Sequence, residues 1–415
     1  MLAIDPLLEG KLLWTPLLIV LGKVVLIFVI GLVATMFMVW FERKVVSGMQ
    51  NRIGPNKAGP FGLLQTLADG IKAFFKETFR PAKSDPLVYK LAPYLMFVPA
   101  FLIWSVLPLG GDFSDGKDGT VTLFGQVTRV QLADPQIGIL LVLAMSSIAV
   151  YGVMLAGWAS GSKYPLLGAV RGSAQMISYE AALGLSIATV FLASGSLSTA
   201  SIVSTQNDLA DWNIATTGVI PFFIFIVAVT AELNRPPFDL VEAEQELVSG
   251  FNTEYGGIGF ALFFLAEFMS VITMSGIIVT LFLGGPQPIE IGGFNLFEWA
   301  GPFMGTLWFV VKLFVFLYMY VWFRATLPRL RYDQLMDLGW KVLIPVSLGW
   351  FLLLAALREF SPDGDFADSL RVTAICVAVG AASVGLFSLA LRVSRRNRES
   401  ADNALTPPSN TGAPV

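Results

Sequence analysis

Nine long apolar segments limit what this chain can fold into. They lie near residues 17–41, 91–109, 136–158, 174–194, 215–233, 257–284, 302–323, 338–357 and 371–391. Each is long enough to cross the roughly 30 Å hydrocarbon core of a bilayer as a helix. Strands of alternating apolar and polar residues, typical of an outer-membrane barrel, do not occur in the sequence. We therefore predict an all-α integral membrane protein with about nine transmembrane helices and amphipathic helices in its cytoplasmic loops.

The composition agrees with a single membrane domain. Hydrophobic residues make up 55% of the 415 residues and charged residues only 14%, which is far from the balance of a soluble domain. The first residues lack a basic start and a small-residue cleavage site, so we expect the first apolar segment to be retained. We predict one polytopic domain over residues 1–398 and a disordered cytoplasmic tail over 399–415, where the sequence is polar and rich in proline.

The loops carry an uneven distribution of charge. If the nine segments span the membrane, 20 of the 27 Lys and Arg residues fall on one side of it. Basic loops face the cytoplasm in most membrane proteins. We therefore predict a multi-pass protein of the bacterial plasma (inner) membrane, with its N-terminus outside and its C-terminus in the cytoplasm.

The scarcity of strong ligands limits the chemistry of the chain. It has one cysteine, Cys376, and no histidine. A cysteine-ligated iron–sulfur cluster and a histidine-ligated haem or zinc are thereby excluded. We predict no metal site and no cofactor bound by this chain alone, so any electrons must travel in another chain.

Several ionisable residues lie inside the apolar segments, where charge is costly and is a sign of function. Glu180, Glu267 and Lys312 are placed well inside their segments, and Glu232 lies near the end of its own. For Glu180, Glu267 and Lys312 we favour function over a purely structural ion pair. Lys23 lies closer to a segment end, so its ammonium group can reach the interface by snorkelling.

The segment TAELNRPPFDLVEAEQELVSGFNTEYGG, after the fifth apolar stretch, is rich in carboxylates: Asp239, Glu242, Glu244, Glu246 and Glu254. Within it, only Arg235 offers a counter-charge. The spacing predicts that Asp239, Glu242 and Glu246 share one face of a short helix. Like charges and burial raise carboxyl pKa values, so the cluster would hold and pass protons near neutral pH. The alternative interpretation is a solvated acidic loop.

Two basic loops are candidate docking surfaces for partner subunits or lipid. The loop after the first apolar segment combines Lys and Arg with glycine–proline turns and an amphipathic stretch over 63–79. It predicts a surface-lying helix or a docking platform, with anionic-lipid binding as the simpler alternative. The second loop, FRATLPRLRYDQLMDLGWK, has the same two interpretations.

Ordered sequence blocks carry a resemblance to a known family. They are ERK at 42–44, RIGPN at 52–56, LADGIK at 67–72, GWAS at 157–160, SKYPLLGAVR at 162–171, AQMISYE at 174–180, AELNRPPFDLVEAEQELVSGFNTEY at 231–255 and RATLPRLRYDQLM at 324–336. Over roughly residues 17–350 the chain resembles the H subunit of proton-pumping NADH:quinone oxidoreductase, respiratory complex I. The resemblance implies a membrane subunit at the junction of the electron-transfer and proton-pumping arms. Quinone would be the substrate, while NADH, FMN and the iron–sulfur clusters would belong to partner subunits.

The resemblance also implies site residues. Its quinone cavity, enclosed with hydrophilic and membrane-arm partner subunits, would take Arg43, Arg52, Asp69 and Arg324. Its proton-transfer residues would be Glu180, Glu232, Asp239, Glu242, Glu244, Glu246 and Glu254, with Glu267 and Arg235 beside them. Lys312 matches a basic position in the seventh segment. No residue of this chain is expected to be a redox centre.

The sequence departs from the family pattern at two places. Gly161 stands where an asparagine often occurs, and the ninth apolar segment exceeds the usual eight. From residue chemistry alone, a stand-alone proton-coupled transporter is the main alternative, because buried Glu and Lys residues suit it equally well. An equivalent subunit of a related membrane hydrogenase or dehydrogenase is another.

Overall fold

The computed structural model describes residues 2–3, 7, 14–113, 119–123, 126–241, 247–289 and 298–360, and the single residues 378 and 385. Its longer helices are α1 Trp14–Met49, α2 Gln65–Phe75, α3 Pro86–Trp104, α4 Gly138–Ala159, α5 Lys163–Ser194, α8 Val219–Glu232, α10 Gly257–Phe282, α11 Met304–Thr326 and α13 Ile344–Phe360. Its shorter elements are β1 Leu2–Ala3, η2 Pro60–Gly62, β2 Thr120–Leu123, β3 Gln126–Arg129, β4 Asp134–Pro135, α6 Thr199–Ser204, α7 Asn213–Thr216, η4 Gly250–Asn252, η5 Glu298–Phe303, α12 Tyr332–Leu338 and η6 Gly339–Leu343.

The predicted all-α membrane fold is confirmed. Within the described residues, seven helices are long and apolar enough to cross a bilayer, and Val219–Glu232 is a shorter apolar helix. These eight coincide with the first eight predicted segments. The eighth is built from α12, the π-helical turn η6 and α13, which follow one another from Tyr332 to Phe360. The predicted ninth segment, 371–391, and the tail lie outside the described residues.

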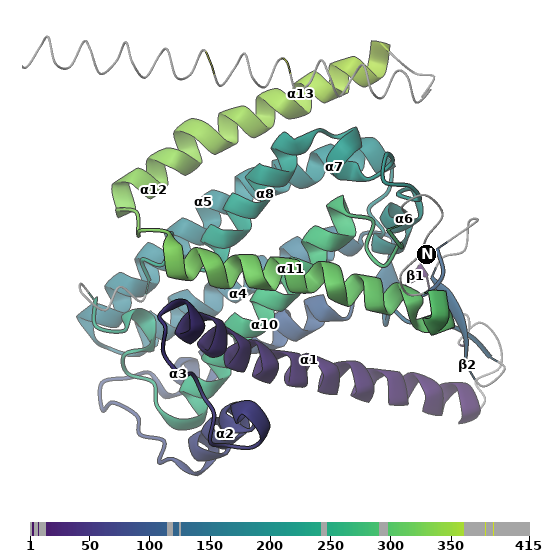
Figure 1. Ribbon diagram of the computed structural model, residues 1–415. Helices are drawn as coiled ribbons and strands as arrows, with labels where there is room; N and C mark the ends of the chain where they lie inside the picture. The colour runs from purple at the N-terminus through teal and green to yellow at the C-terminus, as the bar shows by residue number, and fades with distance from the viewer. Residues whose placement is uncertain are drawn as a thin grey trace, which may run out of the picture.

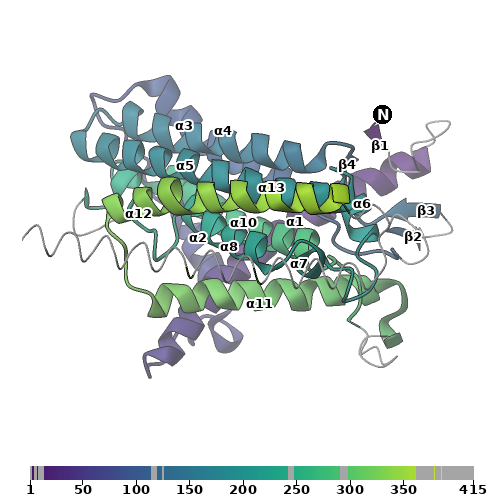
Figure 2. The ribbon, with the colours of Figure 1, turned by 90° about the horizontal axis from the view of Figure 1, so that it is seen from above.

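Helix α10 forms the centre of the bundle. It contacts α1, α3, α8 and α11. In its most apolar 18 residues 72% are buried inside the protein, whereas the corresponding share in α1 is 11%. Helices α3, α4 and α5 pack in sequence on one side, and α11 lies on the opposite side (Figure 2). Helix α13 packs on α5 and α8. Because α10 touches so many helices, groups on it can link elements that are far apart in sequence.

The short elements gather at the two ends of the bundle. Helices α2 and α12 lie toward one end, and β1, β2 and α6 lie toward the other (Figure 1). At that second end β1 pairs with β4 and β2 with β3, both antiparallel. The two basic loops predicted to face one side contain α2 and α12, so the structure brings them to the same end.

Helix α5 begins earlier than hydropathy predicts. It starts at Lys163 rather than near 174, because its first turns are helical but too polar to count as membrane-spanning. The turn before it places Gly161 at φ 65, a left-handed conformation that Gly and Asn adopt more readily than other residues. A Cβ there would lie 2.6 Å from the backbone oxygen of Lys83. The sequence departure at Gly161 therefore falls where the backbone itself favours glycine.

Lys312 of α11 holds the far end of α10. Its Nζ donates to the backbone oxygens of Leu283 at 2.7 Å, Gly285 at 3.0 Å and Gln287 at 2.8 Å. It also lies 4.5 Å from the centroid of the Trp212 ring. A cation at a helix C-terminus satisfies carbonyls that have no partner within the helix. Lys312 thus closes the end of α10 and fastens α11 to it.

We expect Lys312→Met to loosen this end of α10. Each charge-assisted bond lost is worth about 1.5–3 kcal/mol, so amide hydrogen exchange at Gly285 and Gln287 should accelerate by about tenfold or more. Exchange followed by mass spectrometry measures this. Lys341→Met is the matched control, because Lys341 is 70% exposed and pairs with Asp337 at the surface. Unchanged exchange at Gly285 and Gln287 would contradict the proposed role of Lys312 in holding the end of α10.

Candidate functional site

Four charged residues from separate elements form one contact network. Arg235, in the loop after α8, pairs with Glu42 of α1 at 3.3 Å and with Glu267 of α10 at 3.1 Å. Its guanidinium carbon lies 4.5 Å from the centroid of the Phe268 ring. The other carboxylate oxygen of Glu42 pairs with Arg324 of α11. We call Glu42, Arg235, Glu267 and Arg324 the arginine network.

The arginine network is accessible at Arg324 and most buried at its middle. The side chain of Arg324 is 48% exposed, whereas that of Arg235 is 7% exposed. Its two arginines and two glutamates balance in charge. Buried ions are tolerated when they are paired, and removing one partner leaves a charge that the apolar interior cannot solvate. The network therefore fixes α1, α10 and α11 around the loop after α8.

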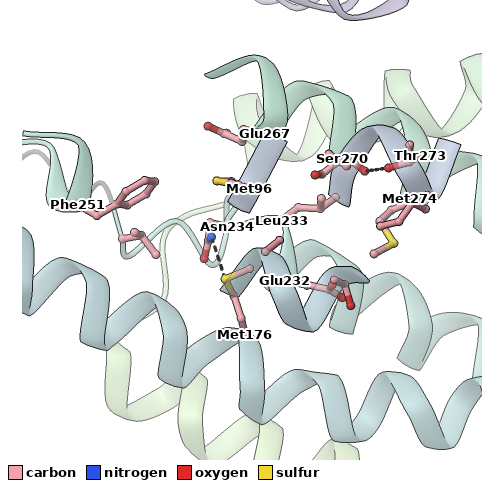
Figure 3. Close-up of a pocket in the computed structure, with 15 residues that line it drawn as sticks. Met96, Met176, Glu232, Leu233, Asn234, Phe251, Glu267, Ser270, Thr273 and Met274 are labelled. Carbon is pink, nitrogen blue, oxygen red and sulfur yellow. Dashed lines mark hydrogen bonds between the residues drawn. The ribbon is translucent and has the colours of Figure 1, made fainter. Parts of the chain in front are cut away.

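An internal cavity of about 50 Å³ adjoins the network. Glu267, from α10, and Glu232, the last residue of α8, both line it (Figure 3). Its other polar lining residues include Ser146, Asn234, Ser270 and Thr273. Since a buried water needs roughly 10–15 Å³ of such volume, the cavity has room for about three waters. We call it the inner cavity. Its wall is mostly apolar, and two carboxyl groups are among the few polar groups that line it.

Glu232 is a buried carboxyl group, one oxygen of which lacks a hydrogen-bond partner in the part of the chain that the structure describes. Only 7% of it is exposed, and the oxygen without a partner is Oε2. Its carboxyl group interacts electrostatically with Glu180 of α5 and with Ser146 of α4. Glu180 in turn accepts a hydrogen bond from Ser147 of α4. Glu232 therefore connects two carboxyl groups, because it shares the inner cavity with Glu267 and interacts with Glu180.

The acidic loop differs from its prediction. Asp239 lies in non-helical backbone after Pro236 and Pro237, so it does not share a helical face with Glu242 and Glu246. It pairs with Arg329 at 2.9 Å. Within the segment Arg235 is the only basic residue, and the structure adds this second counter-charge from a distant loop. Glu242, Glu244 and Glu246 lie outside the described residues.

Glu254 lies beside a stacked tyrosine pair. The hydroxyl of Tyr89 donates to the backbone oxygen of Glu254 at 2.7 Å, and that of Tyr255 donates to the backbone oxygen of Tyr89 at 3.1 Å. The two rings are parallel, with centroids 4.1 Å apart. Burial, helped by the neighbouring Tyr89, raises the pKa of Tyr255, so its hydroxyl keeps its proton. These contacts fix the backbone at Glu254.

The predicted quinone-cavity residues are divided between three positions. Arg43 and Asp69 pair at 2.8 Å between α1 and α2. Arg324 joins the arginine network, and Arg52 donates to Gln50 at 2.6 Å. Helix α2, predicted over 63–79, is present and presents a row of exposed apolar side chains: Leu67, Ile71, Phe74 and Phe75.

Lys312 is not part of this cluster. It contacts the C-terminal end of α10, whereas Glu267 is about 22 Å away along the helix. Residues that the sequence interpretation missed include Glu42, Ser147 and Arg329. Glu42 had one signal, since it is the acidic residue of a conspicuous ERK block at the end of an apolar segment.

Comparisons with known proteins find one family over most of the chain. A family profile described as NADH dehydrogenase matches residues 22–355. A relative from Frankia alni, named as the H subunit of NADH-quinone oxidoreductase, is 49% identical over 84% of this chain and 75% of its own length. A relative of the same name from Streptomyces avermitilis is 46% identical over 94% of this chain and 83% of its own length. Another, from Cutibacterium acnes, is 48% identical over 84% of this chain and 80% of its own length.

A double-mutant cycle tests the arginine network. Arg235→Gln should destabilise the detergent-purified chain by about 3 kcal/mol or more, because Glu267 loses its counter-charge. Adding Glu42→Gln should recover part of the loss, giving a coupling energy above about 1 kcal/mol. Unfolding in sodium dodecyl sulfate, followed by tryptophan fluorescence, measures both quantities.

The control cycle uses Arg331 and Asp333, which pair at 3.5 Å with side chains 81% and 70% exposed. Their coupling should stay within about 0.5 kcal/mol. A coupling between Arg235 and Glu42 as small as that of this surface pair would show that the network does not hold the helices together.

Proposed function

The chain belongs to the family of NADH-quinone oxidoreductase H subunits, and from that premise we propose that it lines the quinone-reducing chamber and couples quinone reduction to proton translocation. It is a multi-pass membrane subunit of that enzyme complex, and other subunits of the complex are its partners.

One observation carries this proposal. A series of polar contacts leads from Arg324, half exposed at the end that holds α2 and α12, through Glu42 and Arg235 to Glu267. From Glu267 the inner cavity continues to Glu232. Ionisable groups arranged in this way inside a membrane domain are typical of proton relays. A change of charge near Arg324 therefore has a physical route to the buried carboxyl groups.

The coupling step follows from charge balance. An iron–sulfur cluster of a partner subunit would supply the electrons, and reduction of the quinone would add negative charge before protons arrive. That charge attracts Arg324 and weakens its hold on Glu42. Arg235 then shifts its pairing toward Glu42 and away from Glu267, so the Glu267 carboxyl favours uptake of a proton from the inner cavity. Glu232 and Glu180 pass the change on toward the membrane arm.

The accessible end of the chain would face the hydrophilic partners. The basic loops with α2 and α12 lie at that end, and Arg43, Asp69 and the exposed apolar face of α2 lie beside them. We place this end in the cytoplasm of a bacterial cell, on the basis of its basic residues. An apolar quinone tail would enter between α1 and α2, where apolar side chains meet charged ones.

The test measures NADH:quinone reduction and proton pumping in membrane vesicles. Glu232→Gln and Glu267→Gln keep shape but remove a titratable group, so we expect an assembled complex with proton pumping reduced about tenfold or more. Asp337→Asn is the control, because Asp337 is 61% exposed and lies on the surface of α12. Full pumping with full quinone reduction in both glutamine variants would refute the proposed role of these carboxyls.

A further inference from the structure

Two consecutive serines stand in the middle of α4, a helix otherwise made almost entirely of apolar residues and glycine. A serine inside a helix usually satisfies its hydroxyl with a carbonyl three or four residues earlier. Here both use one acceptor, because the Oγ atoms of Ser146 and Ser147 lie 2.9 and 3.0 Å from the backbone oxygen of Leu143. The two hydroxyls compete for one carbonyl oxygen, so each can also donate to another acceptor.

Each serine has a carboxyl group as that other partner. The Ser147 hydroxyl bonds Oε1 of Glu180 on α5. Ser146 lines the inner cavity and interacts with Glu232. A hydroxyl carries only one proton and can accept while it donates. Rotation of either hydroxyl therefore switches its proton between the Leu143 carbonyl and a carboxyl group.

The inner cavity supplies the remaining contact. Glu232 has a buried carboxylate oxygen without a hydrogen-bond partner among the described residues. Ser146 and Glu232 both line the cavity, whose volume of about 50 Å³ has room for water. Buried polar atoms are normally satisfied by protein or by water. Water in this cavity would link Glu232 with Ser146.

We propose that Ser146 and Ser147 form a hydroxyl relay that carries a proton between Glu232 and Glu180. The Glu232 carboxyl gives its proton, directly or through cavity water, to the Ser146 oxygen. Both hydroxyls lie against the same Leu143 oxygen and, among the described residues, make no hydrogen bond to each other, so Ser146 releases its own hydroxyl proton to a bridging water. That water passes a proton to Ser147, and Ser147 gives its proton to Glu180. Each serine gains one proton and loses one, so it stays neutral. Glu232 ends ionised and Glu180 protonated.

This inference rests on the proposed proton-coupling function and deepens it. Glu232 and Glu180 come from α8 and α5, and the serines of α4 stand between them. Ser186 shows a different use of a buried hydroxyl, since it donates to the backbone oxygen of Pro221 at 2.6 Å and joins α5 to α8. It offers a matched control that loses a real interhelical bond without touching the relay.

The experiment uses the intact complex in membrane vesicles. Ser146→Ala combined with Ser147→Ala should slow coupled proton pumping about tenfold, with an unchanged KM for quinone and unchanged assembly. Ser147→Thr keeps the hydroxyl at a partly buried position but changes the side-chain volume, so it should pump within about twofold of wild type if the hydroxyl, and not the packing, matters. Ser186→Ala should retain full pumping.

Glu232→Gln, measured in parallel, separates a failure of the serine relay from a failure of the proposed carboxyl coupling. If Glu232→Gln stops pumping while the double alanine variant pumps normally, the relay is wrong and the carboxyl coupling stands. If neither variant affects pumping, both fail. If Ser147→Thr is as impaired as the double alanine variant, or Ser186→Ala is equally impaired, the effect is one of packing and the relay is overturned.

Discussion

The rest of the structure depends on the burial of one guanidinium. Arg235 is 6% exposed and lies among apolar helices, where an unpaired charge would cost more than the fold can supply. It is kept there by Glu42 and Glu267, which come from α1 and α10. This requirement sets how α1, α10 and the loop after α8 meet. It also brings ionisable groups from distant segments into direct contact.

Hydropathy predicted most of the fold, because a bilayer imposes one simple rule on helices. The first eight apolar segments each became a helix or, for the last, a stack of helical turns. Helix ends were predicted less well, since α1 and α5 extend past the apolar stretch into polar sequence. The alignment with the Streptomyces avermitilis relative covers 94% of this chain, so it must extend beyond residue 360. The C-terminal segment is therefore partly shared with that relative.

The site was harder to predict, because its pairs are remote in sequence. Glu42 and Arg235 are 193 residues apart, and no local pattern links them. The same holds for Asp239 and Arg329, since Arg329 lies outside the acidic segment and nothing in that segment points to it. Lys312 was recognisable as a buried cation. Its carbonyl partners could not be inferred, because every residue carries a backbone carbonyl and the sequence does not show which ones lie near Lys312. The residue types showed which side chains would be costly to bury, and only the packing showed which partners offset that cost.

Helix α10 is fastened at its middle and just past its C-terminal end, and this limits how the coupling can work. Glu267, near the middle of the helix, holds it to Arg235, and Lys312 holds the carbonyls that follow its last residue. Sliding the helix would break both sets of contacts. A change in the arginine network is therefore relieved at lower cost by moving side chains and protons than by moving α10. The space of the inner cavity and the hydroxyls of α4 suit that kind of response.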